Sequence, residues 1–394
     1  MSKNYFEDSV KLHLEKKGKL GIVSKVKVED KDDLATVYSP GVAQPCIEIS
    51  KNIELAKTMT IKSNTVAIVS DGSAVLGLGN IGAEASIPVM EGKAILFKEF
   101  ADIDAFPICL KTQDKDELIF IIKNIAPVFG GINLEDIAAP KCFEIEEKLQ
   151  EIGIPVFHDD QHGTAIVLLA AMINACKITG KNMADLKVVI NGSGAAGVAI
   201  MKLLKCIDFD KNYCTSVAEI LMCDTRGIIS KTRTDLNESK RELLKHSNFS
   251  NLHGTLKDAI KNADVFIGVS SGNLLTAEDI KTMNKDAFVF AMANPIPEIM
   301  PEEAYKGGAA IVGTGRSDFA NQVNNVLAFP GIFKGALDAK ATRITPRMKL
   351  AAALALADTI KNPTKDNILP NPFDKNIVKL VSKAVSDAWK LENF

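Results

Sequence analysis

The chain has 394 residues, 46% of them hydrophobic and 24% charged, which is ordinary globular composition and length enough for two or three domains. A formal net charge of −2 gives no excess of basic residues of the kind that nucleic-acid-binding proteins carry. The charged N-terminus lacks the apolar core of a signal peptide, and the longest apolar run, 165–173, is too short to span a bilayer. The seven cysteines include no Cys-x-x-Cys pair, which argues against a zinc module or a disulfide framework. We therefore expect a cytoplasmic protein without nucleic-acid or membrane partners.

The first part of the chain predicts a smaller, mixed α/β domain, for which we expect the bounds 1–160. Its first 60 or so residues show mixed helical patterns, beginning with a short amphipathic helix at 8–17. The strands expected after them are 65–69, 106–110 and 155–157, and the expected helices are 87–99, 116–125 and 143–152.

From residue 163 the pattern becomes regular and predicts a second domain, 161–394. Its expected helices are 164–179, 197–206 and 256–262, and its expected strands are 186–191, 219–223, 265–269, 288–292 and 309–313. This alternation indicates a doubly wound parallel sheet of the Rossmann type. Thr345 followed by Pro346 marks the start of an Ala/Leu-rich helix, the first of the C-terminal helices.

An acidic cluster lies close to the expected domain boundary. Glu135 and Asp136 follow one apolar segment, and Asp159 and Asp160 precede a long apolar helix. Clustered carboxylates near a buried element cost free energy unless a cation or a proton neutralises them. Hard oxygen ligands without a nearby cysteine favour Mg²⁺ or Mn²⁺ over Zn²⁺. A solvated loop with a helix cap explains the cluster equally well on these residues alone.

The segment Gly192-Ser193-Gly194-Ala195-Ala196-Gly197 fits G-x-G-x-x-G between an expected strand and an expected helix. In that context the glycines let the backbone approach a pyrophosphate at the helix N-terminus; the alternative is a tight turn. The next strand ends in Asp224, which would accept hydrogen bonds from an adenosine ribose and favour NAD. The nearby Arg226 and Lys231 could instead contact the 2′-phosphate of NADP. The residues leave this choice open.

Other motifs are weaker. Residues 77–82 repeat the glycine pattern, but we interpret them as a local anion-binding or packing turn. Residues 268–272 match G-x-S-x-G, the motif of a hydrolase in which the catalytic histidine follows the serine along the chain. No histidine follows these residues, which excludes such a hydrolase. Tyr38 lies in a turn, and considered alone it is better explained as an aromatic side chain packed beside that turn than as a functional residue. Lys93 borders an apolar run, where a desolvated lysine can act as a base.

Taken together, these segments resemble the malic enzymes in their short bacterial form, over essentially the whole chain. The resemblance is carried by Tyr38–Ala43, Ser70–Gly82, Glu91–Ala94, Glu135–Asp136, His158–Thr164, Gly192–Gly197, Ala293–Pro295 and Asn324–Gly331.

The resemblance implies an N-terminal malic domain and an NAD(P)-binding domain that together oxidise malate with NADP or NAD, decarboxylate the product and release pyruvate. It implies Lys93 as the base at the C2 hydroxyl, Tyr38 as the acid that protonates enolpyruvate, and Asp159 as a proton relay beside them. The metal ligands for Mg²⁺ or Mn²⁺ would be Glu135, Asp136 and Asp160. The residues expected to bind cofactor or malate are Thr164, Gly192–Gly197, Asp224, Arg226, Asn294 and Asn325, with Asn294 and Asn325 touching malate.

The larger relatives carry an arginine for a malate carboxylate where this chain has Ala74, so backbone amides of residues 73–79 are the candidates here. The resemblance suggests a homodimer, and we hypothesise that Tyr38 serves the partner's site. The competing functions are a malolactic enzyme, an oxaloacetate decarboxylase on the same site, and a catalytically silent nucleotide sensor.

Overall fold

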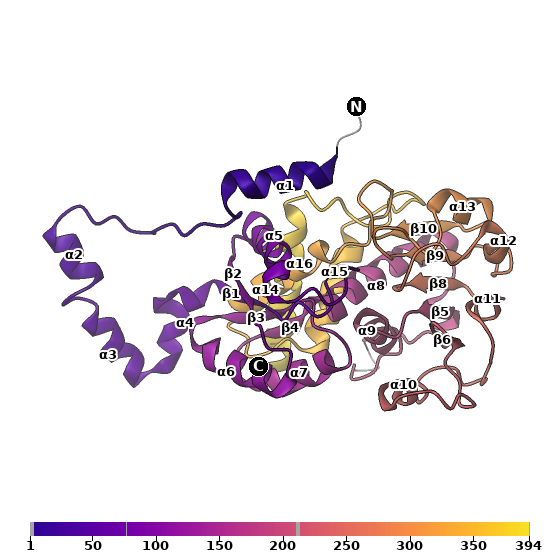
Figure 1. Cartoon of the computed structure of the whole chain (residues 1–394), viewed down its shortest axis with the longest axis horizontal. Helices are drawn as coiled ribbons and strands as arrows, with labels where there is room; N and C mark the ends of the chain where they lie inside the picture. The colour runs from indigo at the N-terminus through magenta and orange to yellow at the C-terminus, as the bar shows by residue number, and fades with distance from the viewer. Residues whose placement is uncertain (1–3, 76, 210–212, 394) are drawn as a thin grey trace.

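The computed structural model describes residues 4–75, 77–209 and 213–393, and it contains two parallel sheets side by side (Figure 1). The α/β class with a Rossmann-type second domain and C-terminal helices is confirmed. A projecting N-terminal arm extends away from the first sheet.

The first sheet has the order β2-β1-β3-β4, and all its pairs are parallel. Its strands are β1 (Thr65–Ser70), β2 (Asp104–Cys109), β3 (Gly131–Leu134) and β4 (Val156–His158). The helices that connect them are α5 (Ala83–Ala101), α6 (Lys115–Ile125) and α7 (Lys141–Leu149). From β1 the chain crosses to β2 on one side and then to β3 on the other. The winding therefore reverses between β1 and β3, and ligands bind beyond the strand ends at such a point.

The second sheet has the order β10-β9-β8-β5-β6-β7 and is parallel except for β7. Its strands are β5 (Lys187–Asn191), β6 (Glu219–Asp224), β7 (Gly227–Ile228), β8 (Val265–Gly268), β9 (Phe288–Ala291) and β10 (Ile311–Thr314). Its helices are α9 (Ala195–Leu204), α10 (Glu238–Leu243), α11 (Leu256–Ala259), α12 (Ala277–Ile280) and α13 (Pro301–Lys306). Here the winding reverses between β5 and β8, which creates a second candidate binding point.

Helix α8 (Asp159–Thr179) joins the two sheets (Figure 1), and most of its residues are buried. The C-terminal helices are α14 (Phe329–Asp338), α15 (Pro346–Asp358) and α16 (Asn376–Asn393). α14 packs against α5 through Phe97, whose ring meets Phe329 and Phe333 edge-on. Within the described residues α8 alone is long and apolar enough to cross a membrane, yet 61% of its most apolar window is buried inside the protein. We therefore interpret α8 as a core helix.

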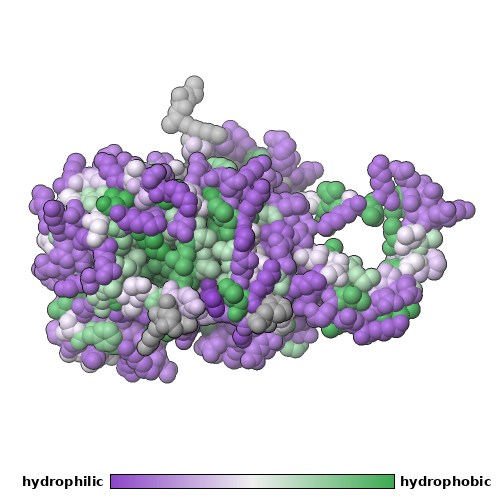
Figure 2. Space-filling model, turned by 180° about the vertical axis from the view of Figure 1, so that it is seen from behind, coloured by the Kyte–Doolittle hydropathy of each residue, from purple (hydrophilic) through white to green (hydrophobic). Residues whose placement is uncertain are grey.

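The arm comprises residues 4–64 and carries α1 (Tyr5–Lys16), α2 (Lys31–Val37), α3 (Ala43–Lys51) and α4 (Ala56–Met59). None of its residues is buried. Hydrophobic side chains lie exposed along it (Figure 2). Those exposed by more than half are Tyr5, Phe6, Val10, Leu14, Ile22, Val23, Val26, Val28, Leu34, Tyr38, Ile53 and Ile61.

Three local expectations differ from the structure. Helix α8 begins at Asp159 rather than at Thr164, because the polar residues 159–162 form its first turn. Strand β3 was not expected, since its four residues are too few to show a period. Cys206 and Cys214 form a disulfide across the loop that follows α9, so the expectation of reduced cysteines is wrong at this pair. The sequence also predicts a surface loop at 209–216, between the glycine motif and the strand that ends in Asp224, and this loop lies partly outside the described residues.

Candidate active site

A cleft of about 650 Å³ opens where the carboxyl ends of both sheets face each other. Ligand sites commonly enclose such a volume. Its walls come from the loops after β1, β3, β5, β8, β9 and β10 and from the first turns of α8. Both reversal points therefore contribute to one cavity, as the doubly wound topology predicts. The residues expected from the sequence that line it are Asp136, Asp160, Thr164, Gly194, Ala195, Ala196, Asn294 and Asn325.

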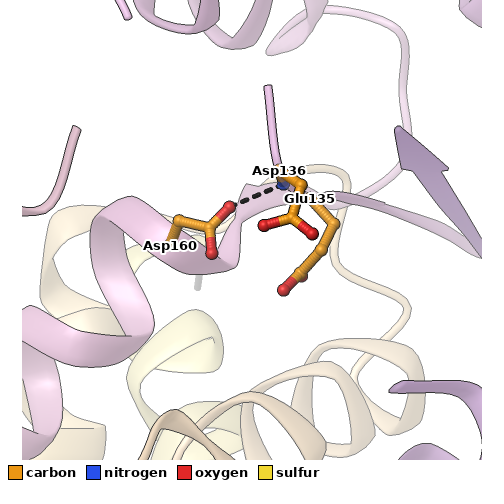
Figure 3. Close-up of side chains that lie close together, drawn as sticks. All are labelled: Glu135, Asp136 and Asp160. Atoms are coloured by element: carbon orange, nitrogen blue, oxygen red, sulfur yellow. Dashed lines mark hydrogen bonds between the residues drawn. The ribbon is translucent and has the colours of Figure 1, made fainter. Parts of the chain in front are cut away.

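Three carboxylates converge at the base of this cleft (Figure 3). Glu135 and Asp136 follow β3, and Asp160 lies in the first turn of α8. One oxygen from each residue lies within 4.8 Å of the others. The backbone N–H of Asp136 donates to Oδ2 of Asp160 over 2.7 Å, which ties the loop after β3 to the helix. The structure thus brings together the three residues expected to bind a metal.

Lys93 reaches the same place from the middle of α5. Its Nζ lies 2.6 Å from Oδ2 of Asp159 and 2.9 Å from Oε1 of Glu135. All three side chains are buried, and Asp159 is 0% exposed. The lysine therefore bridges the acidic cluster and the neighbouring aspartate.

Burial and charge act in opposite directions on these groups. Burial disfavours the charged form of Lys93, but Asp159, Glu135 and Asp160 outweigh it and raise the pKa of Lys93 above its ordinary value. Burial raises the pKa of Asp159 to about 6, although Lys93 opposes this. Burial, with mutual repulsion, also raises the pKa values of Glu135 and Asp160. The cluster therefore holds more negative charge than one lysine neutralises.

The donor set suits a divalent cation. Its three ligands are carboxylate oxygens, the group contains no cysteine or histidine among the described residues, and its charges repel one another. A hard ion such as Mg²⁺ or Mn²⁺ would relieve that repulsion. The buried environment makes a merely solvated acidic loop the poorer interpretation.

The glycine motif forms the turn from β5 into α9, as expected. Gly192 has φ of +125°, and a Cβ there would lie 2.7 Å from the carbonyl oxygen of Val269. A Cβ on Gly197 would lie 1.9 Å from the carbonyl oxygen of Gly192. Both positions thus require glycine, and the turn leaves the N-terminus of α9 open to the cleft. Ser193 belongs to this turn, whereas residues 77–82 form a separate loop before α5.

Asp224 ends β6, where the adenosine ribose of a dinucleotide is expected. Its carboxylate, however, already accepts four hydrogen bonds: from the backbone N–H of Arg226, from Nη1 and Nη2 of Arg233, and from Nζ of Lys240. These donors lower the pKa of Asp224 against the effect of burial. The side chain of Arg226 instead points toward Asp235. Arg233 and Lys240 were missed from the sequence because they lie 9 and 16 positions beyond Asp224.

Tyr38 is the one expected catalytic residue that the structure keeps away from the cluster. It ends α2 in the arm, is 69% exposed and is not among the residues that line the cleft. Figure 1 shows α2 and α3 well apart from α5, the helix that carries Lys93.

Two neighbours of the cluster were missed. The amide of Asn133 donates to Oε2 of Glu135 over 2.8 Å, and Nζ of Lys93 lies 4.3 Å from the ring centre of Phe329. The alternation of side chains along a strand would have revealed Asn133, two positions before Glu135, had β3 been recognised. No sequence spacing could have indicated Phe329.

Comparison with known families agrees with this arrangement. Residues 17–150 match the model of the malic enzyme N-terminal domain, and residues 161–388 match that of the malic enzyme NAD-binding domain. The chain belongs to the malic enzyme family. The resemblance inferred from its motifs is therefore confirmed.

Similar proteins cover nearly all of the chain. The bifunctional malic/malolactic enzyme of Bacillus subtilis is 54% identical over 97% of this chain and 92% of its own length. The NAD-dependent malic enzyme of Geobacillus stearothermophilus is 53% identical over 94% of this chain and 76% of its own length. The crystal structure of the NAD-dependent malic enzyme of Thermotoga maritima is 48% identical, covers 96% of this chain and 98% of its own, and superposes with a TM-score of 0.91.

Proposed function

We propose that this malic enzyme family member oxidises (S)-malate with NADP⁺ or NAD⁺ and decarboxylates the product to pyruvate and CO₂, with Mg²⁺ or Mn²⁺ bound. The observation that carries this proposal is the position of Lys93, between Asp159 and a three-carboxylate cluster, two members of which line a cleft together with the dinucleotide turn. A base, a cation site and a cofactor turn in one cleft are the parts that this reaction needs.

Lys93 is the proposed base for the C2 hydroxyl of malate. To act so, its amine must pass a proton on, and Asp159 at 2.6 Å can receive it. The raised pKa of Asp159 suits this relay, because a buried carboxylate accepts a proton more readily than an exposed one. Asn294, Asn325 and Thr164 line the cleft and are proposed to position cofactor and substrate. Among the described residues no arginine or lysine lines the cleft, so backbone N–H groups near Ala74 remain the proposed partners of a malate carboxylate.

Glu135, Asp136 and Asp160 would hold the divalent ion, which when bound supplies a Lewis acid at the C2 oxygen. We expect Asp160→Asn to raise the Mn²⁺ concentration for half-maximal activity about tenfold or more, since it removes a charged ligand. Asparagine keeps an oxygen that can accept from the Asp136 N–H, so the loop should stay in place. A Mn²⁺ titration measures this, with Asp116→Asn, exposed in the first turn of α6, as control. An unchanged titration would exclude Asp160 as a ligand.

We propose that the chain works as a homodimer in which Tyr38 completes the partner's site. No residue of 4–64 is classed as buried, and an arm with so much exposed hydrophobic surface is unstable in water unless something covers it. A second copy can cover it symmetrically, each arm lying on the other protomer. Such an exchange of arms would bring Tyr38 of one protomer to Lys93 of the other. At that position Tyr38 would protonate enolpyruvate.

We propose NADP⁺ as the preferred cofactor. The saturated carboxylate of Asp224 has no free acceptor for a ribose 2′-hydroxyl, while Arg233 and Lys240 place two cations beside it. Those cations suit a 2′-phosphate. The relatives are divided, since some are named for NAD and others for NADP.

Arg233→Ala is therefore expected to lower the NADP-to-NAD ratio of kcat/KM about tenfold or more, because it removes a phosphate donor and frees Asp224 for the ribose. Steady-state kinetics with both cofactors at saturating malate measure this ratio. The control is Arg241→Ala on α10, which shares no hydrogen bond with Asp224. A ratio that stays constant or moves toward NADP would contradict the proposed preference.

A second activity is favoured by one relative, which is named a bifunctional malic/malolactic enzyme. The same site would then also convert malate to lactate without net release of reduced cofactor. Lactate measured beside pyruvate distinguishes the two activities. Lactate alone, without reduced nicotinamide, would replace the first proposal by the second.

A further inference from the structure

A second cavity, of about 380 Å³, lies behind the acidic cluster and has no part in the proposed chemistry. Helices α7, α8 and α9 and the first turn of α15 form its walls, and we name it the α7–α9 cavity. It shares no lining residue with the catalytic cleft. Its volume falls within the range of small-molecule sites.

One wall is apolar and includes Phe143, Ile166, Val198 and Phe209. Side chains of this kind, contributed by three different helices and a loop, favour a flat hydrophobic body. The polar side chains gather where α7, α8 and α15 approach one another.

At that end, Nε2 of His162 lies within hydrogen-bonding distance of two different side chains. It lies 2.9 Å from both carboxylate oxygens of Glu146 and 3.0 Å from Nζ of Lys349. One ring nitrogen either donates or accepts, so it cannot satisfy both. With the hydrogen on Nε2 it donates to Glu146, which also accepts from the backbone N–H of His158. The ammonium of Lys349 then lacks an acceptor among the described residues, and burial lowers its pKa.

Gln161 supplies an independent second donor. It lines the same cavity and is only 4% exposed, yet its Nε2 has no hydrogen-bond partner among the described residues. A buried amide N–H₂ without a partner costs about 1–3 kcal/mol. One buried and one half-buried donor in one cavity thus lack an acceptor among the described residues.

The remaining charges do not reverse this preference. Lys202 is exposed and adds a positive charge, while Glu147 and Asp208 are exposed carboxylates that water can solvate. The engaged Glu146 is held in its charged form, with a pKa lowered to about 2 by His162 and Lys349 against burial. The unsatisfied groups at this end of the cavity are donors, and these determine what a ligand must offer.

We propose that the α7–α9 cavity binds a small organic anion, in which an acidic group, carboxylate or phosphonate-like, accepts from Lys349 and Gln161 while a flat apolar body lies against the wall of Phe143 and Val198. The site is separate from the catalytic cleft, so binding does not depend on the proposed activity. The cavity nevertheless touches α8, which carries Asp159 and Asp160, and α9, which follows the dinucleotide turn.

The test is ¹⁹F NMR on the full chain with saturating Mg²⁺ and NADP⁺, so that the catalytic cleft is filled. The probes are 4-(trifluoromethyl)benzoate, 4-(trifluoromethyl)phenylphosphonate and, as a cation of equal shape, 4-(trifluoromethyl)benzylamine. We expect saturable line broadening with at least one anion. Its Kd should rise tenfold or more in Lys349→Met and at least threefold in Lys202→Met. Lys148→Met, on α7 but outside the cavity, should leave the Kd unchanged.

Lys202→Met should fold normally even if Lys349→Met does not, because the Lys202 side chain is exposed and makes no hydrogen bond that the structure shows within the described residues. A response confined to the carboxylate or to the phosphonate identifies the acidic group and supports the proposal. Binding of the amine alone, binding of no probe, or equal binding by wild type and both cavity variants would overturn it.

Discussion

Replacing Lys93 by alanine is expected to lower kcat for malate oxidation by about 10²–10⁴-fold, the usual contribution of a general base. The loss follows from the geometry, since Nζ of Lys93 is the only amine that contacts both Asp159 and Glu135 within the described residues. Cofactor affinity, measured by isothermal titration calorimetry, should stay within about twofold of wild type, because the turn at Gly192 lies on another sheet.

Two controls separate chemistry from folding. Lys98→Ala removes an exposed lysine from the same helix, α5, and should leave kcat unchanged, since its exposed ion pairs with Asp102 and Asp104 contribute little. Added methylamine should partly restore activity to Lys93→Ala by supplying an amine to the space left. Turnover of Lys93→Ala equal to wild type would end the assignment of Lys93 as base.

A mixed dimer gives the second large effect. Tyr38→Phe and Lys93→Ala homodimers should each be nearly inactive in pyruvate formation. If Tyr38 serves the partner's Lys93, a heterodimer has one site with both defects and one intact site. Equal co-expression should then restore about a quarter of wild-type activity, since about half of randomly paired dimers are heterodimers. The measurement is kcat of the unfractionated mixture, and the heterodimer isolated from it through two different tags should show about half of the wild-type kcat.

The matched control pairs Lys93→Ala with the double variant Tyr38→Phe/Lys93→Ala, which leaves no intact site in either arrangement. Its activity should remain at background. If the first mixture also stays at background while both chains are shown to pair, each site is built within one chain, and the arm must fold back on its own protomer.

Local signals in the sequence predicted the dinucleotide turn well. A buried strand, three spaced glycines and a helix are adjacent along the chain, so β5, Gly192–Gly197 and α9 could be placed without tertiary information. The acidic residues were also identified, but not their arrangement. Only the parallel pairing of β3 with β4 brings Glu135 beside Asp160 and turns a possible helix cap into a buried cluster.

Contacts that depend on remote packing could not be predicted. Arg233 and Lys240 reach Asp224 from a loop and helix without a period to reveal them. Phe329 meets Lys93 because α14 returns to the first sheet after the chain has crossed the second. The separation of Tyr38 from the cluster has a different cause, because the arm lacks a covering surface within its own chain.

The central proposal is that one site both oxidises and decarboxylates malate. The most direct measurement follows reduced nicotinamide, pyruvate and CO₂ in a single reaction of the purified chain with (S)-malate, NADP⁺ and Mn²⁺. We predict equal amounts of all three products and loss of all three when the metal is chelated. Release of CO₂ without reduced cofactor, or formation of reduced cofactor without CO₂, would contradict the account.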